Sequence, residues 1–207
     1  MAANETGELK RPYELGKRLE QMDQTRAAIL RAARAQLEAK GYRQLTMASL
    51  AAESGVTRQT IHNLFGTKSA VLEALFDSIA LESGMEEMRS IMTHPSAAIM
   101  LERFVDIFSR FWSTNRIFLR RVHGIGAIDL EFGAVLAARN HRRLSAATRI
   151  VSRLSAGKNV KEDAAALTAL TSFEFFDGLA ENTKDEQRAR TIVLELAQRL
   201  LISSRSP

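Results

Sequence analysis

The sequence predicts an all-α protein of about nine helices. Apolar residues recur at intervals of three and four along most of the chain, which is the spacing of one face of a helix. No stretch shows the two-residue alternation of a strand, and the 207 residues include only 11 Gly and 3 Pro. Hydrophobic residues make up 45% of the chain, enough for a sizeable core. We expect a head of three helices at the amino-terminal end, followed by a larger helical body.

Caps and breaks set the boundaries of the predicted helices. Gly41 ends the first helix, Thr67 is a suitable N-cap for the fourth, and the segment 94–96, which contains Pro95, separates the fourth from the fifth. Three glycines interrupt residues 114–133, which we expect to hold one short helix and a loop. The predicted helices cover about residues 24–40, two segments within 46–65, 68–92, 96–113, one segment within 114–133, 132–154, 161–182 and 185–203.

Residues 46–65 have the pattern of a helix-turn-helix with its turn at Gly55. Glycine can adopt the left-handed conformation that ends one helix and redirects the chain. Ala51, four residues earlier, is small where two helices would cross closely. The second helix has polar residues in its first turn, and in such motifs this helix enters the major groove of DNA. The sequence therefore predicts DNA binding.

The polar residues around this second helix are the predicted contacts to DNA. Arg can pair with guanine and Gln with adenine through two hydrogen bonds, so we expect residues 57–60 to meet base edges. His62 and Lys68 would contact phosphates. Thr25 and Thr46 would reach phosphates through hydroxyls or helix N-terminal amides. The predicted DNA-binding residues are Thr25, Thr46, Thr57, Arg58, Gln59, Thr60, His62, Asn63 and Lys68.

The distribution of charge agrees with this prediction. The chain has a net charge of +5, and residues 22–70 hold seven basic and three acidic side chains, whereas the rest is nearly balanced. Positive charge on the predicted head is suited to neutralising phosphates, although a basic surface alone fits solubility equally well.

Three motifs occur at fixed spacings: Thr-Arg-Ala-Ala-Ile-Leu-Arg-Ala-Ala at 25–33, Gly-Tyr at 41–42, and Thr-Met-Ala-Ser-Leu-Ala-Ala-Glu-Ser-Gly-Val-Thr at 46–57. Over about residues 22–82 the chain thereby resembles the TetR/AcrR family of bacterial transcriptional regulators. The resemblance implies a DNA-binding regulator with a pocket among its body helices. Two positions depart from the family pattern, since His62 stands where Tyr is usual and Leu64 where His is usual.

We expect three regions along the chain. Residues 1–21 form a flexible extension, 22–82 the TetR-type DNA-binding domain, and 83–207 a helical regulatory and dimerisation domain. The extension is expected to be a disordered tail. The alternatives are an early start of the first helix and a basic arm that reaches DNA through Lys10, Arg11, Lys17 and Arg18.

The body contains Met and aromatic residues that suit a cavity for a bulky apolar molecule, although at helical spacing they are more often ordinary core. His123 and Glu174 are polar groups within apolar stretches and are candidates for orienting a ligand. The candidate ligand-binding residues are Met88, Met92, Phe104, Phe108, Phe111, Trp112, His123, Phe173 and Glu174.

The last two predicted helices are candidates for dimerisation. The helix at 161–182 is apolar on nearly all sides, and the helix at 185–203 carries one apolar stripe. Large apolar faces are rare on monomers, so we expect a partner copy to cover them. The predicted dimerisation residues are Leu170, Phe173, Phe176, Val193, Leu196 and Leu200.

Catalysis, cofactors and metal binding have no support in the sequence. The chain has no Cys, and its four His are scattered without partners at metal-ligand or triad spacing. No apolar run approaches the ~20 residues needed to span a bilayer. We expect a cytoplasmic protein with no enzymatic activity, no cofactor, no metal and no membrane partner, which is nucleoid-associated when bound to DNA.

The expected function is that of a homodimeric, sequence-specific transcription regulator. It would be a repressor, released from a pseudo-palindromic double-stranded DNA operator by a small apolar or aromatic effector. The alternative is a constitutive DNA-binding factor of the nucleoid or of division, without ligand control. An enzyme with a fused DNA-binding head is disfavoured because no catalytic constellation is present.

Overall fold

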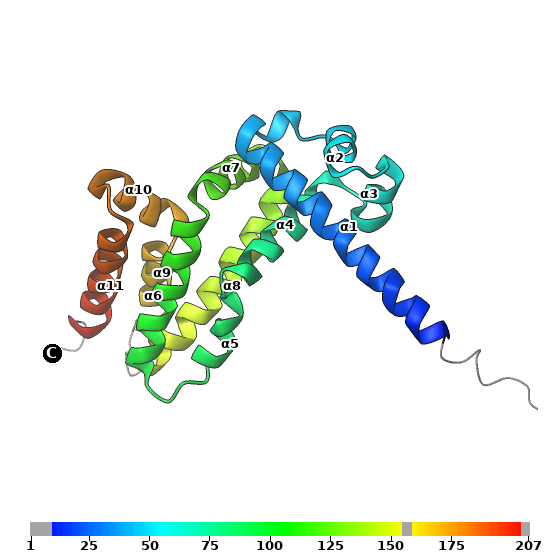
Figure 1. The fold of residues 1–207 in the computed structure, drawn as a ribbon. Helices are drawn as coiled ribbons and strands as arrows, with labels where there is room; N and C mark the ends of the chain where they lie inside the picture. Colours follow the sequence, from blue (N-terminus) through cyan, green and yellow to red (C-terminus); the bar gives the residue numbers. More distant parts are fainter. Residues whose placement is uncertain (1–9, 155–158, 204–207) are drawn as a thin grey trace, which may run out of the picture. The chain divides into compact units, whose positions relative to one another are not determined.

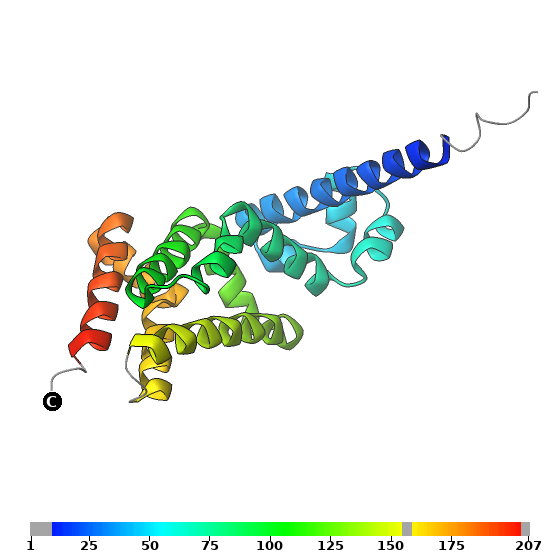
Figure 2. The same ribbon diagram turned by 90° about the horizontal axis from the view of Figure 1, so that it is seen from below.

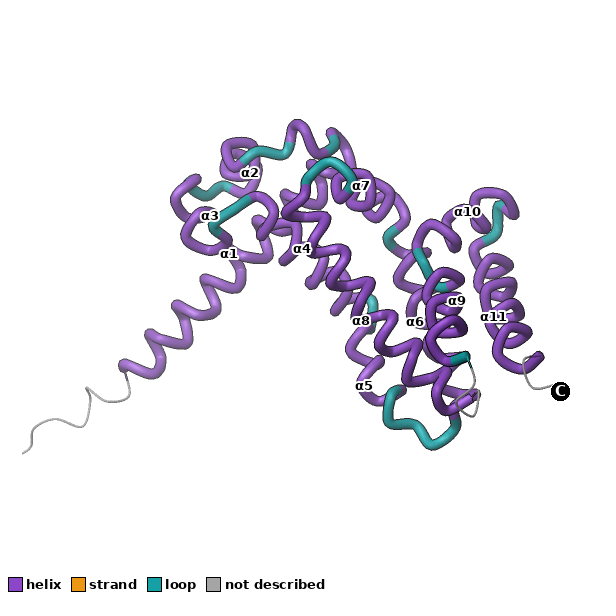
Figure 3. Tube along the Cα trace, turned by 180° about the vertical axis from the view of Figure 1, so that it is seen from behind, coloured by secondary structure: helices purple, strands orange, loops and turns teal. Residues whose placement is uncertain are grey.

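The computed structural model of the protein describes residues 10–154 and 159–203 (Figure 1). These residues form eleven α-helices and two 3-10 helices without a strand (Figure 3), which confirms the predicted all-α class with two more helices than the sequence predicts. The chain divides into two compact units between Leu75 and Phe76, inside helix α4 (Lys68–Glu82). We call the residues up to Leu75 the head unit and those from Phe76 onward the body unit.

The head unit packs its helices around fully buried apolar side chains. Four of these side chains are inaccessible to solvent: Ile29 and Leu37 of α1, Leu50 of α2 and Ile61 of α3. Its elements are α1 (Lys10–Lys40), η1 (Tyr42–Gln44), α2 (Met47–Ser54), α3 (Arg58–Phe65) and the first half of α4.

Helix α1 begins at Lys10 rather than at about residue 24. Residues 10–21, expected within a flexible extension, therefore continue the helix, as the alternative of an early start predicts. Side chains 16–24 are exposed, so helix-favouring residues and backbone hydrogen bonds hold this part, not packing. Of the proposed basic arm, Lys17 and Arg18 are exposed. Residues 1–9 and the side chains of Lys10 and Arg11 lie outside the described part.

The body unit is built around α6 (Ala97–Thr114), which contacts α5, α7, α8, α10 and α11 (Figures 1 and 2). Phe104 and Phe111 of α6 are fully buried. Arg116 and Arg120 of α7 join α10 through ion pairs of 2.8 Å to Asp177. The remaining elements are η2 (Met85–Glu87), α5 (Met88–Ile91), α7 (Arg116–Gly126), α8 (Leu130–Leu154), α9 (Val160–Leu170), α10 (Phe173–Thr183) and α11 (Glu186–Ser203).

Two predicted helices are each broken in the structure. The segment 68–92 stops at Gly84, whose φ of 77° places it in the left-handed region, and continues as η2 and α5. The segment 161–182 is two helices, because the Ser172 hydroxyl accepts a hydrogen bond from the Phe175 amide at 3.2 Å and starts α10 afresh. The helical periodicity of the apolar residues runs through both breaks, which is why the sequence hides them.

Candidate functional site

The head unit contains the predicted helix-turn-helix, in α2 and α3. Thr46 and Ser49 form a capping box at the start of α2: the Ser49 amide donates to the Thr46 hydroxyl at 3.0 Å, and the Thr46 amide donates to the Ser49 hydroxyl at 2.9 Å. Gly55 ends α2 in the left-handed conformation, with φ 72° and ψ 21°. The predicted turn at Gly55 is therefore confirmed.

A buried glutamine on α1 fixes the position of α2. Gln36 is 3% exposed, and its amide donates to the Ser49 carbonyl at 2.9 Å and to the Glu53 carboxylate at 2.7 Å. Its carbonyl accepts from the Ser49 hydroxyl at 2.8 Å. This network holds the helix-turn-helix on α1, and the sequence gives no sign of it beyond a polar residue on an apolar face.

Helix α3 presents a polar face to solvent. Thr57 caps it, with its hydroxyl accepting from the Thr60 amide at 3.1 Å. Arg58 and Gln59 are exposed, and the Gln59 amide donates to the Asn63 side-chain oxygen at 2.8 Å. The face can thus offer a guanidinium and an amide to base edges, as the sequence predicts.

His62 makes a local contact that restricts what it can offer to DNA. Its Nδ1 lies 2.8 Å from the Gly66 carbonyl oxygen. A carbonyl only accepts, so Nδ1 carries the proton, and in the neutral ring Nε2 is an acceptor. His62 can therefore donate to a phosphate from Nε2 only when the ring is doubly protonated.

Two other predicted phosphate contacts lie outside α3. The Lys68 ammonium lies 3.5 Å from the centroid of the Tyr42 ring, which fixes it at the start of α4. Thr25 lies inside α1, where its hydroxyl donates to the Gln21 carbonyl at 2.8 Å. The expected route from Thr25 through helix N-terminal amides is wrong, because α1 begins fifteen residues earlier at Lys10 and only its hydroxyl remains.

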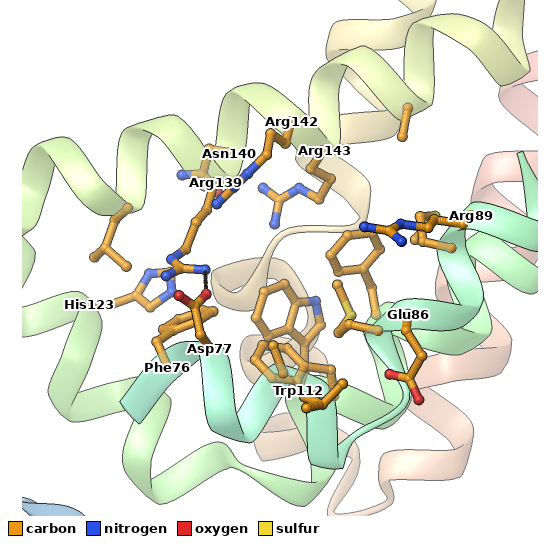
Figure 4. A pocket seen from close by; sticks show the side chains of 18 residues that line it. Phe76, Asp77, Glu86, Arg89, Trp112, His123, Arg139, Asn140, Arg142 and Arg143 are labelled. Carbon is orange, nitrogen blue, oxygen red and sulfur yellow. Dashed lines mark hydrogen bonds and ion pairs between the residues drawn. The ribbon is translucent and has the colours of Figure 1, made fainter. Parts of the chain in front are cut away.

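The body unit holds a cavity of about 640 Å³ (Figure 4). Its size lies within the range of small-molecule sites. The lining residues come from α4, η2, α5, α6, α7 and α8, and they are Phe76, Asp77, Ala80, Leu81, Met85, Glu86, Met88, Arg89, Phe108, Phe111, Trp112, His123, Leu136, Arg139, Asn140, Arg142, Arg143 and Ala146.

Five of the nine predicted ligand residues line this cavity, namely Met88, Phe108, Phe111, Trp112 and His123. The other four, Met92, Phe104, Phe173 and Glu174, do not line it. Phe104 is fully buried in the core, and Phe173 packs behind the wall against Trp112 and His123, with ring centroids 5.8 and 4.9 Å apart. Periodicity identifies the inner face of a helix but not which inner residues border empty space.

His123 and Glu174 form a pair at one side of the cavity. His123 Nδ1 lies 2.5 Å from the Glu174 carboxylate, and the Glu174 side chain is 67% exposed. This hydrogen bond is the main reason that the pKa of Glu174 falls to about 2, and the positive charge of Arg143 lowers it further. Glu174 thus orients the His123 ring at the edge of the cavity. It does not itself face a ligand there, because it is not one of the lining residues.

The polar side of the cavity comes from α8, whose arginines are not among the residues predicted from the sequence to bind a ligand. Arg139 pairs with Asp77 at 2.7 Å and lies over the Phe76 ring, 4.3 Å from its centroid. Arg143 is only 8% exposed, and burial lowers its pKa to about 10. A signal was present, since Leu136, Arg139, Arg143 and Ala146 follow helical spacing and set two arginines on an inward face.

The predicted dimerisation residues separate into two groups. Phe173, Phe176 and Val193 are 1–3% exposed within one chain, so they belong to the core and cannot supply an interface. They are buried because the break at Ser172 turns α10 back onto α6 and α11. Leu170, Leu196 and Leu200 are only half-buried.

Within the described ranges, the His, Asp and Glu side chains form no group of three that could hold a metal ion. The helices of that part are also each too short or too polar to cross a bilayer.

Comparison with known proteins finds a family match within the head unit. Residues 29–75 match the family model of bacterial regulatory proteins, tetR family. A search among curated protein sequences gives no match.

Solved structures share the fold of nearly the whole chain. A putative TetR-family transcriptional regulator from Syntrophomonas wolfei str. Goettingen is 18% identical with a TM-score of 0.70, covering 87% of this chain and 96% of its own. The SmeT-triclosan complex is 23% identical with a TM-score of 0.64 and covers 84% and 90%. A putative transcriptional regulator from Saccharomonospora viridis in complex with choline is 17% identical with a TM-score of 0.57 and covers 84% and 95%.

The helix-turn-helix of the head unit, with the exposed polar face of α3, is the arrangement that DNA-binding transcription regulators use. The amino-terminal region resembles the TetR family over residues 29–75, and the chain shares its fold with solved TetR-family transcription regulators. The resemblance that the sequence indicates is thereby confirmed.

Proposed function

We propose that the protein is a homodimeric repressor that a small molecule releases from a pseudo-palindromic operator. The observation that carries this proposal is the 640 Å³ cavity in the body unit of a chain whose head unit has a helix-turn-helix. A concave site of this size, with aromatic and apolar walls and a few polar groups, is typical of small-molecule binding. The solved relatives in complex with triclosan and choline support the idea of a ligand at such a fold.

Dimerisation is proposed through α10 and α11. Half-buried apolar side chains repeat at four-residue spacing on α11, at Ile192, Leu196 and Leu200, and on α10, at Phe175 and Leu179. Each row lies along one face of its helix. Packed against the same rows of a second copy, they would form a four-helix interface with two-fold symmetry.

Control is proposed to run through α4. Its first residues belong to the head unit, while Phe76, Asp77, Ala80 and Leu81 line the cavity. Two heads of a dimer engage successive major grooves only when they are about 34 Å apart. A ligand that displaces the second half of α4 would change that separation and weaken operator binding.

In vitro selection from a random DNA pool tests the proposed function. The full-length protein should recover a sequence with two inverted half-sites, since a symmetric dimer requires a symmetric site. Recovery of DNA without sequence preference would contradict the proposal and favour a constitutive nucleoid or division factor.

A further inference from the structure

The cavity wall carries an excess of positive charge. Four arginines and two carboxylates line it, and Asp77, one of the carboxylates, already pairs with Arg139. The other, Glu86, is exposed, as are Arg89 and Arg142. Water solvates these exposed groups and weakens their effect on a bound ligand. Inside the cavity, the buried charge of Arg143 therefore has the largest electrostatic effect.

Arg143 is a buried cation without an ion-pair partner among the described residues. Its Nε is buried and makes no hydrogen bond. In Figure 4 its guanidinium points from α8 into the cavity, towards Trp112. The Glu174 carboxylate acts on it electrostatically without forming an ion pair with it. Two aromatic rings lie beside it, with its central carbon 5.6 Å from the ring centroid of Phe108 and 5.8 Å from that of Trp112.

Such a group is costly to maintain for packing alone. Rings at this distance offset part of the desolvation penalty of a guanidinium but give it no acceptor. A ligand carboxylate would supply two acceptors in the planar geometry that a guanidinium matches. The rest of the wall, with Phe76, Phe111, Met85 and Leu136, suits an apolar body.

We infer that the cavity binds an amphipathic organic anion, whose carboxylate pairs with Arg143 and whose apolar body lies against the aromatic and methionine side chains. This inference rests on the proposed function only in placing the effector in the cavity. It predicts the sign of the ligand's charge, because a cationic ligand would be repelled by the buried positive charge of Arg143.

The test compares acids with their neutral carboxamides by isothermal titration, in the absence of DNA. The pairs are naphthoate and naphthamide, biphenylcarboxylate and biphenylcarboxamide, and decanoate and decanamide. At least one acid is expected to bind the wild-type protein about ten- to a hundredfold more tightly than its amide. Arg143→Gln should abolish that preference while leaving the affinity for the amide within about threefold.

Arg142→Gln is the matched control, since it removes the same charge from an exposed position one residue away on α8. It should keep the preference for the acid. Arg143→Met, similar in bulk but uncharged, repeats the comparison if glutamine is not accommodated. Equal binding of acid and amide in all three pairs, or a preference that survives both Arg143 variants, would overturn the anion site. An acid that binds through Arg143 and leaves operator affinity unchanged supports the site and contradicts the proposed control instead.

Discussion

Arg58, Gln59 and Lys68 would offer DNA different kinds of contact. Arg58 and Gln59 are exposed in the first turn of α3, where helix-turn-helix proteins meet base edges. Lys68 is half-buried beside Tyr42 at the start of α4 and has a charge suited to a phosphate. The first two would choose the sequence, and the third would add affinity for any sequence.

Arg58→Ala and Gln59→Ala should each cost about 1–3 kcal/mol on the selected operator and relax specificity at one base position. Lys68→Ala should weaken all sequences about equally and flatten the salt dependence of binding. Fluorescence anisotropy with the operator and single-base variants measures both effects. Arg199→Ala, at an exposed position on α11, is the control and should change neither. Unchanged operator affinity in the three head variants would remove α3 from the interface.

Helix α4 ends where Gly84 takes a left-handed backbone, and the cavity wall depends on this stop. A Cβ at Gly84 would lie 2.8 Å from Glu87 Oε1 and 2.9 Å from Arg110 Nη2, two groups that form an ion pair. The break redirects the chain so that Met85 and Met88 line the cavity from η2 and α5 instead of from a continued α4.

Gly84→Ala should therefore destabilise the protein by about 1–2 kcal/mol, from backbone strain together with displacement of the ion pair. Gly178→Ala is the matched control, because Gly178 lies inside α10 with open space around it. It should stabilise by about 0.5–1 kcal/mol. Urea unfolding of both variants at one protein concentration measures the difference. Equal midpoints for the two variants would contradict the account of this break.

Sequence periodicity predicts the elements better than it predicts their ends. The helix-turn-helix was predictable because its caps are local, in Thr46, Gly55 and Thr57. The start of α1 was predicted only as an alternative, from the helical spacing of Leu15, Leu19 and Met22. Residues 16–24 are exposed, so no buried face distinguishes this helix from a flexible tail. The break at Ser172 depends on one hydroxyl and was equally hidden.

The residues that line the cavity are harder still to predict from the sequence. Its aromatic members could be proposed from composition, but Arg143 could not be ranked above the other arginines without knowing that α8 buries it. The boundary of an empty space depends on several helices at once. The same limit applies to the predicted dimer interface. Phe176 can be excluded from it only once the structure shows that this side chain is buried within a single chain.

The proposed dimer makes a distinct prediction. Leu196→Glu should give a folded monomer, because the side chain is half-buried in one chain and would be fully buried only between two. Gln198→Glu, exposed on the same helix, should leave the dimer intact. Sedimentation velocity at micromolar concentration distinguishes these states, with circular dichroism as the check on folding. A wild-type protein that sediments as a monomer would exclude this interface.

Linkage between the cavity and the operator is the measurement that decides the proposed regulation. The affinity of a carboxylate that the cavity binds should be measured by titration with and without saturating operator, using the fluorescence of Trp112 in the wall. If the ligand releases the repressor, the operator must reduce the ligand's affinity by the same factor by which the ligand reduces the operator's. We predict a reduction of about 5- to 150-fold, the usual range of coupling between sites. An affinity that is the same with and without operator would contradict ligand control and leave a constitutive DNA-binding factor.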